Sequence, residues 1–380
     1  HTTTTTTTTT NNNNNNTTPT MSDPGIRKKR RVSSGSPPFS AKTPSSLSPA
    51  SPSTTQLDLR MSNTTRIKEH FHLVLPECAH IVWELAQEIE PTNTTMAFAA
   101  LDIQLVGPFD CMANKQRVDE DEPWSNHYRY KFDPPEVVTM FKSVKDANLH
   151  FGYHRDAPFL EPTMVVSNNA GDDGKFVQSA TTLIEAMLYH ATAVTTTTTT
   201  GANTVAITTT TVAITTTTTT TVANTVATGA STVTTAPGLI VERLNKALKQ
   251  QQQQQQQHKN LDKKREKCVD TTLSTLGIVV PYNKETEVGW RPLNISDKKL
   301  HNYFTKLLKC KENGTTPDFS QLDKLIAFAN ISNDEGDYGQ ALKLGLDLLS
   351  FDVVFDKDAR GLLAPTYSLL SRDEFSNVIT

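Results

Sequence analysis

The sequence predicts an α+β protein with an N-terminal mixed domain of helices and antiparallel strands and a mainly helical C-terminal domain. Three observations support this fold class. Apolar residues recur at helical spacing over residues 81–89, alternate with a period of two in stretches between residues 103 and 153, and return to helical spacing over residues 322–349. Low-complexity runs flank these segments, and they contain too few bulky apolar residues to build a core.

The 380 residues divide into four expected segments. We expect residues 1–60 to be a disordered, low-complexity and basic tail, and residues 61–193 to form the α+β domain. Residues 194–237 are a Thr-rich insert that we expect to be disordered, and residues 238–380 form the helical domain. Thr and Val have high strand propensity, so a β-solenoid or an aggregation-prone tract is the alternative for the insert.

Helices are expected at both ends of the α+β domain. Asn63 or Thr64 can cap a first helix, and Pro76 can begin a second. A further helix over residues 179–190 closes the domain. These helices would cover the strands that lie between them in the sequence.

Strands are expected where apolar or aromatic residues alternate, at residues 103–106, 128–132 and 149–153. The Asp-Pro-Pro run at residues 133–135 should end the second strand, because proline cannot donate a hydrogen bond to a β-ladder. In the helical domain a short strand is expected at residues 277–281. The domain is otherwise helical.

Composition restricts the classes of function. The formal net charge is −3, so the whole molecule is not a basic nucleic-acid-binding protein. No stretch approaches the roughly 20 apolar residues that a membrane span needs, and we expect no membrane partner. The four cysteines show no C-x-x-C spacing, which favours reduced thiols in the cytosol or nucleus.

A compact basic cluster lies in the tail and comprises Arg27, Lys28, Lys29, Arg30 and Arg31. Clusters of this kind serve as nuclear import signals, which is the interpretation we prefer. A solvated run of charge is the alternative. We therefore expect the protein in the nucleus.

The clearest concentration of chemical groups is a turn at residues 333–339. It places Asp334, Glu335 and Asp337 within four residues, together with two glycines. Crowded like charges are unfavourable unless they are used or solvated. Composition alone favours a plainer interpretation, in which the two Asp residues cap helices and Glu335 is merely exposed. A calcium loop fails on spacing, because the sixth position lacks Gly and the twelfth lacks Glu.

Familiar catalytic signatures are missing from the chain. The sequence contains no G-x-G-x-x-G run, no Walker loop, no H-E-x-x-H and no G-x-S-x-G. We therefore expect no metal site and no cofactor bound by this chain. An acidic turn without a nucleotide-binding loop indicates a protein that contributes a group to chemistry whose cofactor is held elsewhere.

Five runs in order carry a family resemblance. They are residues 104–110 (QLVGPFD), 132–136 (FDPPE), 152–156 (GYHRD), 288–291 (VGWR) and 333–339 (NDEGDYG). These runs resemble the hallmark segments of the histone PARylation factor family, over roughly residues 61–190 and 238–380. Three positions depart from better-known members: Gly336 stands in place of Cys, Ile331 in place of an aromatic residue of some relatives, and Trp290 in place of the Tyr that known members often carry.

The resemblance implies an accessory factor that binds the catalytic domain of a DNA-damage-activated poly(ADP-ribose) polymerase. Such a factor completes the polymerase active site and directs ADP-ribosylation to serine on histones. NAD is then held by the polymerase, and this chain alone is not an enzyme. Histones are further implied partners, poly(ADP-ribose) is a candidate ligand, and we expect a monomer that acts on the chromosome at sites of DNA damage.

The resemblance also implies roles for particular residues. Glu335 corresponds to the shared catalytic carboxylate, which would accept the serine proton. Asp334, Arg291 and Trp290 correspond to partner-binding residues, although Trp290 could equally be a core residue. Lys357 lies in a segment that faces the polymerase or its substrate in the family.

Two functions of other classes compete with this hypothesis. A self-sufficient ADP-ribosyl or glycosyl hydrolase could use the acids of the turn, but it would need its own concave sugar site. A chromatin regulator could instead depend on the low-complexity Gln, Asn and Thr tracts.

Overall fold

The computed structural model describes residues 54–115, 122–199, 236–252, 263 and 266–380. These described residues all belong to one compact unit. In the first half of that unit the elements are α1 (Thr54–Phe71), α2 (Glu77–Ile89), η1 (Thr94–Met96), η2 (Ala99–Leu101), β1 (Ile103–Leu105), α3 (Pro108–Met112), η3 (Trp124–Asn126), β2 (Val137–Ser143), β3 (Leu149–His154), β4 (Met164–Asn169), β5 (Val177–Ala180), α4 (Leu183–Thr199) and α5 (Pro237–Gln252).

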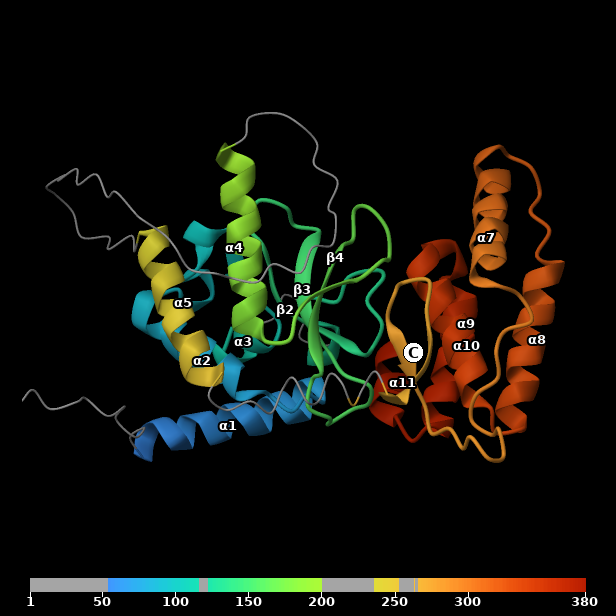
Figure 1. The fold of residues 1–380 in the computed structure, drawn as a ribbon, viewed down its shortest axis with the longest axis horizontal. Helices are drawn as coiled ribbons and strands as arrows, with labels where there is room; N and C mark the ends of the chain where they lie inside the picture. Colours follow the sequence, from blue (N-terminus) through green and yellow to red (C-terminus); the bar gives the residue numbers. More distant parts are fainter. Residues whose placement is uncertain (1–53, 116–121, 200–235, 253–262, 264–265) are drawn as a thin grey trace, which may run out of the picture. The chain divides into compact units, whose positions relative to one another are not determined.

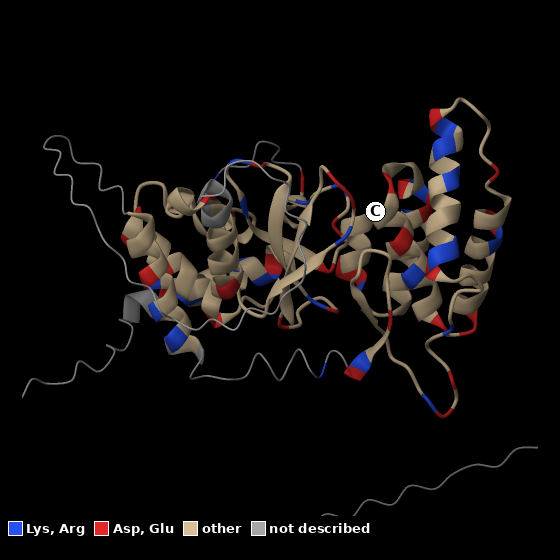
Figure 2. Cartoon of the chain, turned by 45° about the horizontal axis from the view of Figure 1, so that its top comes forward, with Lys and Arg blue, Asp and Glu red and all other residues tan. Residues whose placement is uncertain are grey.

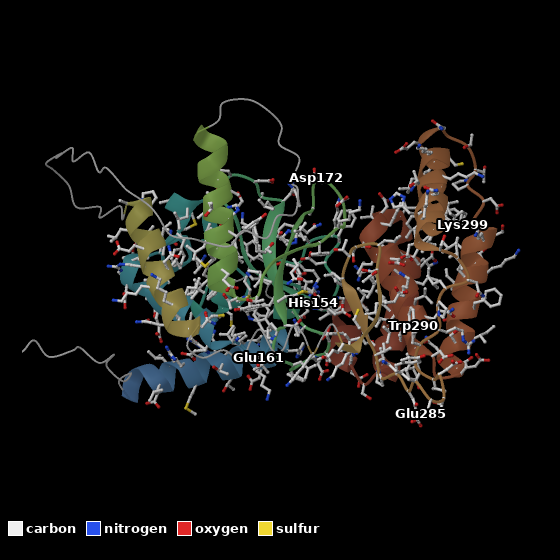
Figure 3. All side chains as sticks on the ribbon, viewed as in Figure 1. His154, Glu161, Asp172, Glu285, Trp290 and Lys299 are labelled. Carbon is white, nitrogen blue, oxygen red and sulfur yellow. The ribbon has the colours of Figure 1, made fainter. Side chains whose placement is uncertain are left out.

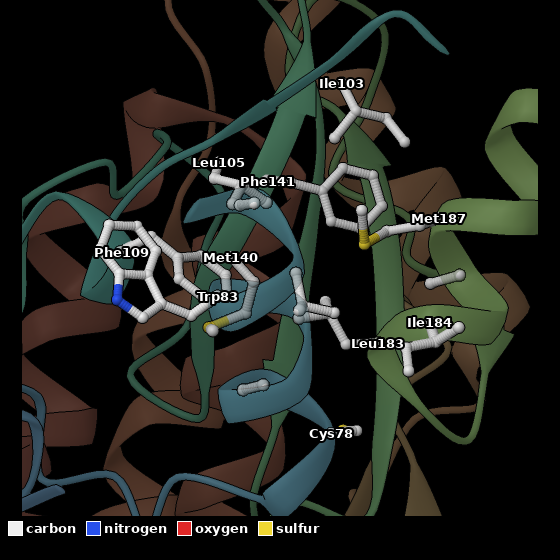
Figure 4. Close-up of a cluster of buried hydrophobic side chains, with 14 of the residues drawn as sticks. Cys78, Trp83, Ile103, Leu105, Phe109, Met140, Phe141, Leu183, Ile184 and Met187 are labelled. Atoms are coloured by element: carbon white, nitrogen blue, oxygen red, sulfur yellow. The ribbon is translucent and has the colours of Figure 1, made fainter. Parts of the chain in front are cut away.

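An antiparallel sheet is the centre of this half. Within the described residues it has five strands in the order β1-β2-β3-β4-β5, so each strand pairs with its neighbour in the sequence. Its apolar face packs against helices α2, α4 and α5 in one cluster. Figure 4 shows part of that cluster, in which the rings of Trp83 and Phe109 stack with centroids 5.9 Å apart. The expected mixed helix and antiparallel-strand architecture is confirmed.

Helix α5 packs in the same apolar cluster as the sheet and helices α2 and α4. Ile240, Leu244 and Leu248 are buried there at helical spacing. The expected boundary at residue 238 had grouped this helix with the helical domain instead. Residues 1–53 of the expected tail and residues 200–235 of the Thr-rich insert lie outside the described residues. Residues 54–60 and 194–199, which were expected to be disordered, are instead helical, in α1 and α4.

The strand expected at residues 128–132 was wrong. Tyr128 has a positive φ of 59°, and the backbone N–H of Tyr130 donates to the Asp133 carboxylate at 3.1 Å, so this segment is a turn. The strand begins after the proline pair, with β2 at Val137. Pro134 therefore precedes a strand, and its carbonyl accepts a hydrogen bond from the Val137 N–H at 2.9 Å.

The second half is mainly helical, as expected. Its elements are β6 (Cys268–Thr271), β7 (Gly277–Val279), α7 (Asp297–Glu312), α8 (Ser320–Asp334), α9 (Tyr338–Phe351), η4 (Val353–Phe355), α10 (Asp356–Leu369) and α11 (Asp373–Ile379). Strand β7 confirms the short strand expected at residues 277–281, whereas its partner β6 was not predicted.

Helices α8, α9 and α10 form the core of the second half. Leu322 and Leu325 of α8 are buried in the same cluster as Leu342 and Leu349 of α9, which confirms the helical periodicity seen in the sequence. Helices α9 and α10 lie side by side (Figure 1). The acidic turn is the connection between α8 and α9.

Charged residues are distributed along the whole of the described chain. Lys and Arg recur along α7, whereas both signs of charge are interspersed elsewhere (Figure 2). Among the described residues, no helix has the length and apolar character needed to cross a membrane.

Candidate functional site at the acidic turn

The acidic turn is a helix C-terminus closed by glycine. Gly336 has a φ of +88°, and its N–H donates to the Asn333 carbonyl at 3.1 Å. The next N–H, of Asp337, donates to the Ser332 carbonyl at 2.7 Å. These two bonds form the Schellman motif, which requires a left-handed residue directly after the cap. Glu335 is therefore the C-cap residue of α8, and its side chain is 51% exposed.

The run of residues 289–291 lies directly against this turn. The Gly339 N–H donates to the Gly289 carbonyl at 3.1 Å, and the Gly289 N–H donates to Oδ1 of Asp337 at 2.8 Å. The approach is close enough that a Cβ on Gly339 would lie 2.6 Å from a ring carbon of Trp290. The absence of a side chain at Gly339 thus allows two segments that are far apart in the sequence to meet.

Arg291 connects two acids of the turn. Its Nη1 lies 2.7 Å from Oε2 of Glu335, and its Nη2 lies 2.6 Å from Oδ2 of Asp337. The hydrogen bond to Glu335 is the main reason that the pKa of Arg291 is raised, and the charge of Asp337 adds to it. Arg291 and Glu335 are both about half exposed, so this pair is open to solvent, whereas Asp337 is buried.

Two other expected site residues lie beside this arrangement. Trp290 is half-buried and packs against the core of the second half, and it lies on the loop between β7 and α7, as does Glu285 (Figure 3). Asp334 is the last residue of α8 and is exposed. Within the described residues the Asp334 carboxylate has no ion-pair partner. Its solvent-exposed position leaves it accessible to another protein.

Lys357 lies away from the turn. Lys357 is exposed in the first turn of α10. This turn is close to the C-terminal end of α9, because only a short connection joins the two helices. The other end of α10 faces the acidic turn, since Asn333 donates to Thr366 at 3.0 Å. The 14 residues of α9 span about 20 Å, which separates Lys357 from Glu335. The basic cluster at residues 27–31 falls outside the described residues.

The acids of the turn lie outside the open hollow that is next to them. An open hollow of about 850 Å³ begins at Pro292 and is also lined by Asp297 and Lys343, but none of the three acids of the turn contributes to it. In the described part of the chain, no three His, Cys, Asp or Glu side chains converge as metal ligands.

Asp337 was not predicted as a site residue. Its partner Gly289 lies 48 positions earlier in the sequence, and no local pattern relates the two. Gly339 is a sequence signal for this contact, because a Cβ at that position would clash with Trp290 of the 289–291 run.

The fold and the site define an α+β protein that presents a carboxylate and a guanidinium side by side on its surface. A sequence model of histone PARylation factor 1 matches residues 62–243 and 231–380. The chain therefore belongs to the histone PARylation factor 1 family, which confirms the resemblance carried by the five runs.

Curated relatives agree with this assignment. Histone PARylation factor 1 of Bos taurus is 26% identical over 320 residues, which are 82% of this chain and 84% of that protein. Histone PARylation factor 1 of Danio rerio is 29% identical over 317 residues, which are 82% of each chain. A putative histone PARylation factor 1-like protein of Homo sapiens is 24% identical over 331 residues, 85% of this chain and 86% of that protein.

Proposed function

We propose that this chain is an accessory factor that binds the catalytic domain of a poly(ADP-ribose) polymerase and completes its active site with Glu335 as general base. The factor directs ADP-ribosylation to serine on histones and other proteins in the DNA damage response. The observation that carries this proposal is the exposed Glu335 carboxylate, which the Schellman turn and Arg291 hold at the surface, outside the hollow that begins at Pro292.

The chemistry explains why serine needs an added carboxylate. A serine hydroxyl is a weak nucleophile, and attack on the ribose carbon of NAD passes through an oxocarbenium-like transition state. The bond between that carbon and the nicotinamide nitrogen breaks, a bond to the serine oxygen forms, and Glu335 accepts the hydroxyl proton. Asp and Glu acceptors arrive ionised and need no such base, so the acceptor residue changes while the cofactor stays the same.

The surface around Glu335 has the composition of a protein interface. Phe328, Ile331 and Val288 are each nearly half exposed. Ile331 lies one helical turn before Glu335, and Val288 is the nearest side chain to the Cβ position of Gly336, at 3.5 Å. Exposed apolar side chains that gather beside charged residues are typical of binding sites.

The same proposal assigns partners to the rest of the site. Asp334, Arg291 and Trp290 contact the polymerase, and Lys357, at the far end of α9, contacts either a more distant part of the polymerase or the substrate protein. NAD is held by the polymerase, and the chain binds no cofactor itself. Histones are the acceptor proteins, poly(ADP-ribose) is a further candidate ligand, and the free chain is a monomer.

Localisation follows from the same function. We propose that the chain acts in the nucleus, on the chromosome at sites of DNA damage. The cluster Arg27, Lys28, Lys29, Arg30 and Arg31 would direct import. A fluorescent fusion with these five residues changed to Ala should lose nuclear enrichment, and unchanged enrichment would remove the cluster from this role.

A reconstituted reaction tests the proposed function. A DNA-activated polymerase from the same organism, NAD and a histone peptide with a single serine are incubated with or without the chain. We expect serine labelling only when the chain is present, and no turnover by the chain alone. Labelling that does not depend on the chain would contradict the proposal, and hydrolysis of ADP-ribose conjugates by the isolated chain would favour the hydrolase hypothesis.

A further inference from the structure

Asp337 differs from the two other acids of the turn in its burial. Its side chain is only 6% exposed, whereas that of Glu335 is 51% exposed. Asp337 occupies the N-cap position of α9, yet its side chain makes no capping hydrogen bond to that helix. The helix-cap role that composition favours for this residue is therefore not the role that the structure shows.

Both oxygens of Asp337 are used by the run that carries Arg291. Oδ1 accepts the Gly289 N–H at 2.8 Å, and Oδ2 lies 2.6 Å from Nη2 of Arg291. A buried carboxylate is stable only when charged or hydrogen-bonding partners compensate for lost water, and these two contacts supply that compensation. The position of the Asp337 carboxylate is therefore fixed by partners on both of its oxygens.

The other end of the guanidinium reaches the proposed base. Nη1 of Arg291 lies 2.7 Å from Oε2 of Glu335. The guanidinium is planar and rigid, so fixing Nη2 on Asp337 also fixes the direction in which Nη1 points. Without Asp337, a half-exposed arginine and a half-exposed glutamate would share a contact that solvent weakens.

We infer that Asp337 is a positioning residue that orients the Glu335 carboxylate through Arg291. This inference rests on the proposed function, because it names the group that holds the base for the serine reaction. A displacement of about 1 Å in a reacting group can reduce the rate about 100-fold. Asp337 therefore sets how efficiently the shared site modifies serine, although it does not contact the acceptor.

The test uses Asp337→Asn in the full chain with the polymerase. The Asn side-chain oxygen can still accept the Gly289 N–H, but its amide group cannot accept a hydrogen bond from Arg291. At saturating chain we expect kcat for serine labelling to fall about 10- to 100-fold, while the melting temperature of the chain stays within a few degrees. A labelling rate equal to that of the wild type would overturn the inference.

A matched control removes a comparable contact far from the turn. Arg60 also bridges two carboxylates, with Glu77 at 2.6 Å and Glu84 as the second partner. Glu84→Gln takes away the less exposed of those two partners, as Asp337→Asn does for Arg291. We expect this control to label serine at the wild-type rate, and an equal loss in the control would overturn the specific role of Asp337.

A double-mutant cycle separates positioning from a general loss of structure. If Asp337 acts through Arg291, then Asp337→Asn has little further effect once Arg291 is Ala. Each variant is assayed at a chain concentration above its own dissociation constant. Asp337→Asn could instead reduce kcat for serine labelling by the same factor in the wild-type and Arg291→Ala backgrounds. That result would show that Asp337 acts independently of Arg291, which would overturn the inference.

A measurement on the isolated chain does not depend on the polymerase. Guanidinium N–H signals of Arg291 in nuclear magnetic resonance spectra should be resolved in the wild type and in Glu335→Gln, but averaged in Asp337→Asn. Loss of these signals in Glu335→Gln would show that Glu335 holds Arg291, and would overturn the inference even if Asp337→Asn did not fold. A wild-type chain that labels no serine would instead overturn the proposed function, and this inference with it.

Discussion

Tyr367 of α10 donates hydrogen bonds to both carboxylate oxygens of Glu136, 2.9 Å from each, although the two residues are 231 positions apart. Both side chains are buried, and Glu136 directly precedes β2. Burial raises the pKa of Glu136, while Arg372 and the Tyr367 hydroxyl act in the opposite direction. This contact joins the helical half to the sheet. It holds the C-terminal part of α10, which also contacts α8 next to the acidic turn through Thr366.

Tyr367→Phe should destabilise the chain by about 1–3 kcal/mol, because the buried Glu136 carboxylate loses a donor and water cannot readily replace it. Urea denaturation of the isolated chain measures the effect. Tyr189→Phe is the control, since Tyr189 is exposed and its loss should change the free energy of unfolding by no more than about 0.5 kcal/mol. Equal effects of the two substitutions would show that the Tyr367 contact does not stabilise the fold.

The raised pKa of Asp347 predicts how the free energy of unfolding depends on pH. Burial raises its pKa from 3.8 to about 7, even though Lys343 lies 3.4 Å away. Because the folded state holds this proton more tightly than the unfolded state does, the associated stability is complete below about pH 3.8 and is lost as the pH rises through about 7. Lys343 stays protonated over this range: burial acts to lower its pKa, but Asp347, Asp297 and Asp270 outweigh burial and raise it.

Asp347→Asn should remove this dependence, because an amide does not titrate and its oxygen can still accept the Leu273 N–H. We expect the stability of the wild type, relative to this variant, to decrease as the pH rises from about 4 to about 7. Urea denaturation at several pH values measures the difference. A constant difference across that range would contradict the assignment to Asp347.

Gly289→Ala should disrupt the run that carries Arg291. The φ of Gly289 is +112°, and a Cβ there would lie 1.9 Å from the Pro281 carbonyl oxygen. We expect a loss of at least about 2 kcal/mol in the free energy of unfolding and weaker binding to the polymerase. Gly361→Ala in α10 is the control, because its Cβ would meet nothing within 4 Å, and it should stabilise the chain by about 0.5–1 kcal/mol.

Arg291→Ala should weaken the complex with the polymerase by about 2 kcal/mol, which is about a 30-fold increase in the dissociation constant. Glu335 and Asp337 each engage one Nη atom of Arg291, but a guanidinium has five N–H donors and this side chain is about half exposed, so N–H groups remain for a carboxylate of the polymerase. Calorimetry or fluorescence titration measures the affinity. Arg243→Ala is the control, because Arg243 of α5 is a partly exposed arginine in the other half of the molecule. An unchanged dissociation constant for Arg291→Ala would remove Arg291 from the interface.

Local patterns in the sequence predicted the elements that position the turn. Leucines at helical spacing predicted α8 and α9, and with them the turn between the two helices, because periodicity reports directly which face is buried. Strand β4 was missed because its first three residues are all buried, so no alternation appears. Alternating aromatic residues at 128–132 predicted a strand, but Tyr130 instead stacks on His150 with ring centroids 3.8 Å apart.

Long-range contacts could not be predicted in the same way. The sequence singled out Glu335 and Arg291 separately, through different runs, but the ion pair that joins them is a property of the fold. Asp337 was interpreted as a helix cap rather than as a site residue, because its burial depends on the 289–291 run, which packs on the start of α9 from far away in the chain.

The most direct test of the central claim is the reconstituted serine reaction with Glu335→Gln. Gln has nearly the same shape as Glu but cannot accept the serine proton, so we expect labelling to fall at least about 100-fold while affinity for the polymerase stays within a few-fold. Glu312→Gln, an exposed acid at the end of α7, should label like the wild type. Serine labelling by Glu335→Gln at the wild-type rate, with the complex intact, would contradict the account.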